Sequence, residues 1–211
     1  MIGFDTFWLF LLTSIALALA PGPDILFVIT QGVTRGAKAA VTLACGLSSG
    51  VIVHTALAAL GVSVIFKTSS TAFFILKIIG AAYLFYLAFQ TFVHRNELVR
   101  VENKKDRKSL SAKKLFIRGF FMNVLNPKVI LFFLALFPQF VKEQNGLVAF
   151  QMAQLGAIFM LSTLGVFIVV GTLADKASKT LMNNPKFAKF ANILTSCIFA
   201  AIAVKLAFSQ A

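Results

Sequence analysis

The pattern of hydrophobic positions divides this chain into six long apolar segments separated by short polar stretches. The runs within them are continuous rather than alternating, which favours membrane helices over the strands of a β-barrel. Each segment reaches or approaches the roughly 20 apolar residues that a helix needs to cross a bilayer. We therefore predict an all-α, polytopic membrane protein with six transmembrane helices, at about residues 5–30, 39–62, 71–93, 115–138, 147–173 and 187–209.

The composition agrees with this pattern. Of the 211 residues, 59% are hydrophobic, whereas soluble domains average about 45–50% apolar residues. Little sequence remains for a soluble domain, so residues 1–211 are expected to form a single integral membrane domain. The first segment has no basic stretch before it, and its apolar run is too long for the core of a signal peptide. We expect it to remain as the first span.

The net charge of +13 is distributed unevenly along the chain. With six spans, the connecting loops alternate between two faces of the membrane. Most Lys and Arg residues fall in the loops of one face, above all between His94 and Lys114, whereas only Lys67 and Lys142 fall in the loops of the other. The positive-inside rule makes the basic face cytoplasmic and puts both termini on the non-cytoplasmic side. Binding of nucleic acid or anionic lipid by the His94–Lys114 linker is an alternative, but a solvated topology determinant explains it more simply.

Two polar interruptions stand inside predicted spans, and each combines a helix break with a charge. Pro21-Gly22-Pro23-Asp24 interrupts the first span, and Asn126-Pro127-Lys128 interrupts the fourth. A charged side chain at the bilayer centre costs about 2.5–3.5 kcal/mol on insertion scales. A break also frees backbone N–H and C=O groups that lipid cannot satisfy. Such features persist where they line a polar cavity inside the protein. We therefore expect the first and fourth transmembrane helices (helices 1 and 4) to be broken by proline beside a substrate site.

The linker at about 94–114 divides the six helices into three plus three. Because each half holds an odd number of spans, the second half enters the membrane with the opposite orientation. Inverted repeats of this kind recur in transporters. We predict a first repeat at about 1–93 and a second at about 115–211.

A weak internal similarity supports this division. Superposing Pro23 on Pro127 aligns Asp24-Ile25-Leu26-Phe27 with Lys128-Val129-Ile130-Leu131. Paired proline interruptions at corresponding positions of two halves point to a substrate site. The alternative is that both breaks are packing kinks whose backbone groups are satisfied by neighbouring helices.

The two breaks carry opposite charges. The half-helices after the breaks present unpaired N–H groups and the positive ends of their dipoles. Asp24 offers a partner for an ammonium group, and Lys128 offers one for a carboxylate, so an α-amino acid fits between them. The predicted substrate-binding residues are Gly22, Asp24, Asn123, Asn126 and Lys128. The alternatives are helix capping by Asp24, a structural Asp24–Lys128 ion pair, and satisfaction of freed backbone groups by the two asparagines.

A spacing of four relates Gly46, Gly50 and His54 within the second predicted span. Small residues at such spacing allow close helix approach, so this face should meet another helix and keep His54 inside the protein. The ordinary pKa of histidine lies near physiological pH, which makes His54, together with Asp24, a candidate to carry a coupling proton. A satisfied interhelical hydrogen bond is the alternative for His54.

Taken together, these motifs resemble the LysE/RhtB family of bacterial amino-acid exporters over nearly the whole chain. The resemblance implies an exporter in the bacterial plasma membrane that moves amino acids or their derivatives by proton antiport. Substrates across that family include basic amino acids, threonine, homoserine and its lactones, and branched-chain amino acids. The residues that carry the resemblance are Ala20-Pro21-Gly22-Pro23-Asp24, Gly46-x-x-x-Gly50-x-x-x-His54, Leu76–Leu84, Asn123–Lys128, Leu131-Phe132-Phe133 and Pro138-Gln139-Phe140-Val141.

Other function classes find less support. The chain has no P-loop pattern, and we expect no enzymatic activity, cofactor or metal. A passive channel or a membrane assembly factor is the main alternative. A thiol–disulfide carrier using Cys45 and Cys197 is weaker, because neither cysteine lies beside a break and no CxxC motif exists. The expected partners are an amino-acid substrate, protons and the lipid bilayer but no nucleic acid, and a homo-oligomer is left open.

Overall fold

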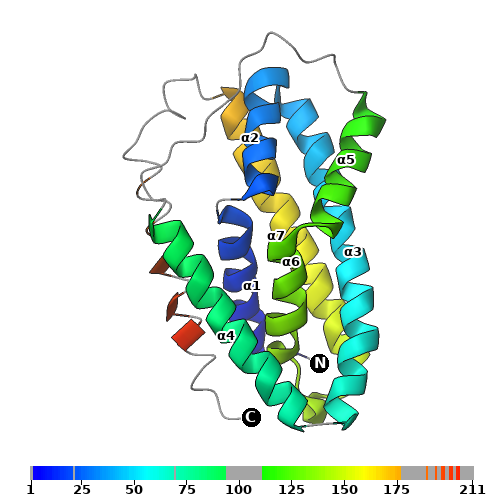
Figure 1. Ribbon diagram of the computed structural model, residues 1–211. Helices are drawn as coiled ribbons and strands as arrows, with labels where there is room; N and C mark the ends of the chain where they lie inside the picture. The colour runs from blue at the N-terminus through cyan, green and yellow to red at the C-terminus, as the bar shows by residue number, and fades with distance from the viewer. Residues whose placement is uncertain are drawn as a thin grey trace.

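All regular elements described for this chain are helical, which confirms the predicted all-α class (Figure 1). The computed structural model describes residues 2–20, 22–68, 70–93 and 111–176, with scattered residues between 189 and 204. The longer helices are α1 (Phe4–Leu19), α2 (Pro23–Arg35), α3 (Ala37–Thr68), α4 (Ser70–Val93), α5 (Ala112–Val124) and α7 (Val148–Lys176). Between α5 and α7 lie the shorter α6 (Pro127–Leu131), η2 (Phe132–Leu136), η3 (Phe137–Phe140) and η4 (Glu143–Asn145).

Four of the predicted spans have counterparts among the described helices. Helices α3 and α7 are each long and apolar enough to cross a membrane. Two further candidates are bent pairs: α1 and α2 meet at 62°, and α5 meets the helix that begins at Pro127 at 45°. The predicted breaks in the first and fourth spans are therefore confirmed, between α1 and α2 and between α5 and α6.

The remaining two spans stay predictions. The third predicted span is the helix α4, but within the described residues this helix is not among the candidates by length and hydropathy. In Figure 1, α4 runs obliquely beside the other helices. The sixth predicted span, 187–209, lies largely outside the described residues.

Helices α3 and α7 pack against each other in antiparallel orientation. A Cβ atom added at Gly171 would collide with Ala40, and one added at Gly156 would collide with Thr55. Positions early in α3 therefore meet positions late in α7, and the helices approach so closely because the glycines carry no side chain.

The face of α3 that carries Gly46 and Gly50 packs against α5. A Cβ atom at Gly46 would collide with the backbone carbonyl of Phe116, and one at Gly50 would lie 2.8 Å from Asn123 Oδ1. His54, on the same face, is buried. The prediction that this face meets another helix and holds His54 inside the protein is confirmed.

Two apolar clusters meet near the helix breaks. One is centred on the aromatic rings of α1, η2, η3 and α7, including Phe10, Phe132 and Phe159. The other joins α2, the first half of α3 and the last half of α7, and includes Val28 and Leu43. The polar breaks lie where the first cluster gives way to the second, so apolar packing holds both ends of the broken helices in place.

Beyond the second break, the chain departs from α-helical geometry. Helix α6 continues into the π-helical turn η2 and then the 3-10 turn η3. Pro138 accounts for part of this, since it has no N–H to donate and its ring clashes with the carbonyl four residues earlier. Short π-helical turns often accompany functional sites.

We predict that Gly46→Ala lowers the stability of the detergent-solubilised protein by about 1–3 kcal/mol, the usual effect of overpacking. The added methyl group would push α3 away from the Phe116 carbonyl. Thermal unfolding measurements would check this, with Gly61→Ala as the control on the same helix, because nothing lies within 4 Å of a Cβ atom at Gly61. Equal melting temperatures for the two variants would contradict the close packing described.

Candidate functional site at the two helix breaks

The first break leaves backbone carbonyls of α1 without helical partners. In an uninterrupted helix the Leu17 carbonyl would accept from residue 21, but this residue is a proline and has no N–H. Pro23 begins α2 at a position where the missing N–H costs nothing. The bend between the helices also separates the Ala20 carbonyl from the N–H of Asp24. Buried carbonyls of this kind must find other donors.

The donor is the ammonium group of Lys128, which comes from the other half of the chain. Its Nζ donates to the carbonyl oxygens of Leu17 at 2.9 Å and Ala20 at 3.2 Å. The carboxyl-terminal end of a helix carries partial negative charge, so a cation is favoured there. Lys128 itself is only 8% exposed, and these two bonds compensate for part of the cost of burying its charge.

The second break is capped by Asn126, whose side chain also binds Asp24. Asn126 Oδ1 accepts a hydrogen bond from the backbone N–H of Lys128 at 2.9 Å, which caps α6. Its Nδ2 donates to Asp24 Oδ2 at 2.6 Å. Asp24 and Asn126 are both buried. A single amide therefore joins the start of α2 to the start of α6.

Asp24 and Lys128 lie near one another but do not form a direct ion pair within the described part of the chain. The hydrogen bonds of Lys128 Nζ go to α1, and that of the Asp24 carboxylate goes to Asn126. The second carboxylate oxygen, Asp24 Oδ1, is buried and has no hydrogen-bond partner there. Gly22 provides room for the lysine, since a Cβ atom at Gly22 would lie 3.3 Å from Nζ. The structural ion pair considered from sequence is thus absent from the described residues, and the charges remain available.

Asn123 and His54 extend this polar region toward α3. His54 Nε2 lies 3.2 Å from the backbone oxygen of Asn123, and a carbonyl oxygen only accepts, so Nε2 is the donor. The imidazole ring also stacks on Phe133 with ring centroids 5.3 Å apart. The interhelical hydrogen bond considered for His54 is confirmed. Asn123 Oδ1 is buried without a hydrogen-bond partner among the described residues.

Sequence reasoning missed two buried hydroxyl groups, those of Ser48 in α3 and Thr163 in α7. The antiparallel contacts of these helices put the two residues at the same level on facing sides. Most other hydroxyls of this kind, such as that of Ser14, donate to the carbonyl four residues earlier, but those of Ser48 and Thr163 have no partner in the described residues. The Gly46–Gly50 spacing gave no signal for them, since Ser48 is two residues from either glycine and therefore lies on a different side of α3.

Comparison with known proteins decides the family. The family profile described as LysE type translocator matches residues 15–210, a range that contains both breaks and all the residues above. The chain belongs to this LysE-type translocator family. The resemblance identified from the motifs is therefore confirmed, and the chain is a membrane protein of a translocator family.

Two relatives of this chain are named homoserine/homoserine lactone efflux proteins, from Salmonella typhimurium and Salmonella typhi. Each is 33% identical over 211 aligned positions, in an alignment that covers 98% of either chain. An uncharacterised membrane protein of Bacillus subtilis is 30% identical over 199 aligned positions, in an alignment that covers 92% of this chain and 94% of the relative. No solved structure matches the chain significantly.

We predict that Asn126→Ala destabilises the protein by about 1 kcal/mol more than Asn126→Ser does, which is a typical contribution of a helix cap. Serine can still cap α6 but cannot reach Asp24, whereas alanine loses both bonds. Melting temperatures in detergent should therefore fall in the order wild type, Ser, Ala. If serine matched the wild type, the Asn126–Asp24 bond would contribute nothing to stability.

Proposed function

We propose that this protein exports amino acids or amino-acid derivatives across the bacterial plasma membrane. The observation that supports this most directly is Asp24 Oδ1, which has no hydrogen-bond partner among the described residues and is buried near the Lys128 ammonium group where two broken helices meet. A buried polar atom without a partner costs about 1–3 kcal/mol. Such a cost is understandable if a ligand supplies the missing partner.

The site matches the two ends of a small amino acid. The substrate ammonium group would donate to Asp24 Oδ1, which no protein group occupies among the described residues. An ammonium group has three donors and Lys128 directs hydrogen bonds at two carbonyls, so one N–H can meet the substrate carboxylate. Asn123 Oδ1 would accept from a further polar group of the substrate, while Asn126 and Gly22 hold the charged side chains in position.

The relatives suggest which substrates to examine first. Their names specify efflux of homoserine and homoserine lactone, two small compounds that both carry an ammonium group. Our proposal is that this chain accepts the same class of compound. The alternative of a thiol–disulfide carrier is not proposed, because neither Cys45 nor Cys197 lies beside a helix break. We propose no enzymatic activity, metal or cofactor for this protein.

We further propose that the chain is a six-helix transporter domain of two inverted repeats, at about 1–93 and 115–211, joined by the 94–114 linker. The basic loops would face the cytoplasm and both termini the opposite side of the inner membrane. The polar bonds that join the two halves, from Asn126 to Asp24 and from Lys128 to α1, support this view. Rocking of the halves around these bonds would expose the site alternately to either side.

Proton coupling completes the proposal, with Asp24 and His54 as the candidate carriers. The Asp24 carboxylate would bind either a proton or the substrate ammonium group, but not both. Export of the substrate would then be linked to entry of a proton. His54 is hydrogen-bonded to the second broken helix, so a change in its charge would act directly on α5. No oligomer is required by this mechanism.

We predict that Asp24→Asn abolishes export, because a neutral amide cannot replace the carboxylate at the substrate ammonium group. The measurement is homoserine in the medium of cells that express each variant at equal membrane abundance. Asp5→Asn is the matched control, since Asp5 is an exposed acidic residue at the start of α1. Full export by Asp24→Asn would contradict the role assigned to this residue.

We predict that an outward-directed export cycle requires a pH gradient. Inside-out membrane vesicles that are acidified internally should accumulate homoserine above the external concentration, and a protonophore should remove the excess. In His54→Gln vesicles, loss of accumulation with retained exchange would assign the proton to His54, whereas retained accumulation would assign it to Asp24. Uptake that ignores the gradient in wild-type vesicles would indicate a passive channel.

A further inference from the structure

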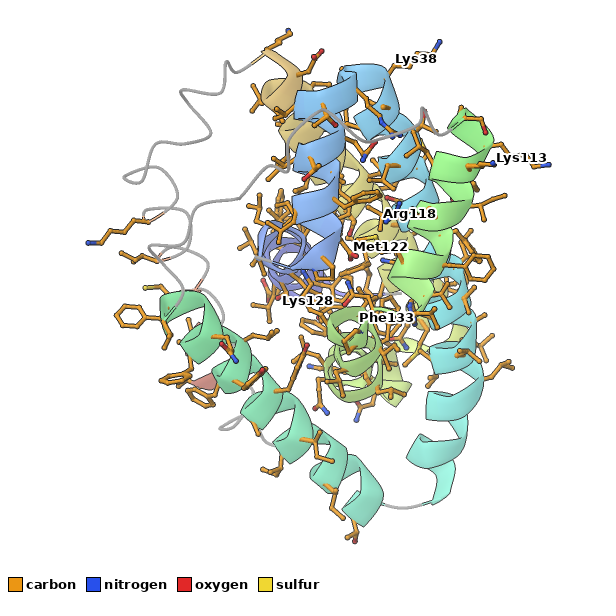
Figure 2. All side chains as sticks on the ribbon, turned by 45° about the horizontal axis from the view of Figure 1, so that its top comes forward. Lys38, Lys113, Arg118, Met122, Lys128 and Phe133 are labelled. Carbon is orange, nitrogen blue, oxygen red and sulfur yellow. The ribbon has the colours of Figure 1, made fainter. Side chains whose placement is uncertain are left out.

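Two contacts link α2 to α5 and the segment after it, along the half of the bundle that we assign to the cytoplasmic side. The Asn126–Asp24 hydrogen bond joins the start of α2 to the N-cap of α6, two residues after α5 ends. Further from the site, Arg118 of α5 lies over the ring of Phe27 of α2, with its Cζ 4.4 Å from the ring centroid. Figure 2 shows Arg118 between the two helices, whereas Lys113 on the same helix points away from the molecule.

The Arg118 guanidinium lies over the Phe27 ring, so its contact in the described part of the chain is with an aromatic face rather than with a hydrogen-bond acceptor. Stacking on an aromatic face is a favourable contact for guanidinium, and it leaves the N–H groups at the edge of the plane accessible. No hydrogen bond or ion pair to Arg118 occurs in the described part of the chain, and the side chain is exposed. Arg118 therefore differs from Lys128, whose ammonium is buried and already donates to two carbonyls.

Both helices lead from this contact to the site. Arg118 and Met122 are four residues apart and share a face of α5, and Asn126 follows shortly after that helix ends. On α2, Phe27 is three residues beyond Asp24, which is about 4.5 Å along the helix axis. A molecule that moves from the basic face toward Asp24 between these helices would pass Arg118 first.

We propose that Arg118 captures the carboxylate of the substrate at the entrance to the site. The planar guanidinium matches a carboxylate through two parallel hydrogen bonds, and the stacked Phe27 ring keeps it oriented for that contact. This inference rests on the export function proposed above. It further divides the substrates into two classes: free amino acids have the carboxylate, whereas in homoserine lactone it is closed into a neutral ester. Arg118 would therefore select free amino acids and contribute little to the lactone.

The test compares the two compounds in inside-out vesicles, which present the cytoplasmic face to the medium. Arg118→Gln should raise the KM for homoserine about five- to tenfold, the effect of losing charge-assisted hydrogen bonds at an accessible site. The KM for homoserine lactone should stay within about twofold of wild type, as for ordinary surface substitutions. Arg118→Lys keeps the charge without the planar pair of donors and should fall between wild type and Arg118→Gln for homoserine. Lys113→Gln removes an exposed cation from the same helix and should change neither KM.

Unchanged lactone transport in Arg118→Gln also shows that the variant is folded and inserted. Equal changes of KM for both compounds, or no change for either, would overturn the carboxylate role and indicate a structural or lipid-anchoring arginine. Wild-type vesicles that transport neither compound would overturn the proposed export and this inference with it. In that case Asp24→Asn vesicles would be indistinguishable from wild type, whereas failure of the arginine proposal alone leaves the Asp24 dependence intact.

Discussion

The carbonyl groups of Leu17 and Ala20 have lost their helical donors, and the Lys128 ammonium group replaces them. The rest of the site depends on this interaction, because a broken helix in an apolar surrounding is stable only when its freed backbone groups are satisfied. Lys128 belongs to the first turn of α6, where the dipole of its own helix disfavours a cation. Its side chain instead reaches the end of α1, where the dipole favours one. The break in one half of the chain is therefore stabilised by a residue of the other half.

Asn126 has the complementary role at the second break. Its amide caps α6 and holds one oxygen of Asp24, so that the acid and the base are kept close without neutralising each other. A direct ion pair would have satisfied both charges and left little for a ligand. The arrangement found here satisfies most of the lysine donors and, among the described residues, only one carboxylate oxygen. The resulting asymmetry favours binding of a cationic group at Asp24. In our proposal, the substrate carboxylate therefore makes its first contact with the more exposed Arg118.

Features that depend on local chemistry could be predicted from the sequence. Long apolar runs predicted α3 and α7, the prolines predicted both bends, and the Gly46–Gly50 spacing predicted a closely packed helix face. Features that depend on tertiary distance could not. Lys128 donates to carbonyls of α1 and not to Asp24. This arrangement depends on how segments more than a hundred residues apart approach one another. The pairing of Arg118 with Phe27, and the facing hydroxyls of Ser48 and Thr163, likewise depend on the register between helices, which hydrophobic periodicity does not encode.

The π-helical turn η2 limits how the chain can vary in length beyond the second break. Such a turn accommodates about one more residue than an α-helical turn. Deleting one residue between Phe132 and Leu136 would let the turn close with ordinary α-helical winding while the segments on either side keep their orientation, so that the side chains of the turn itself are redistributed around the helix. Phe133, whose ring stacks on His54, would then face a different neighbour. A one-residue gap at this position in a homologous chain would therefore signal a changed environment for that histidine, even where every polar residue of the site is retained.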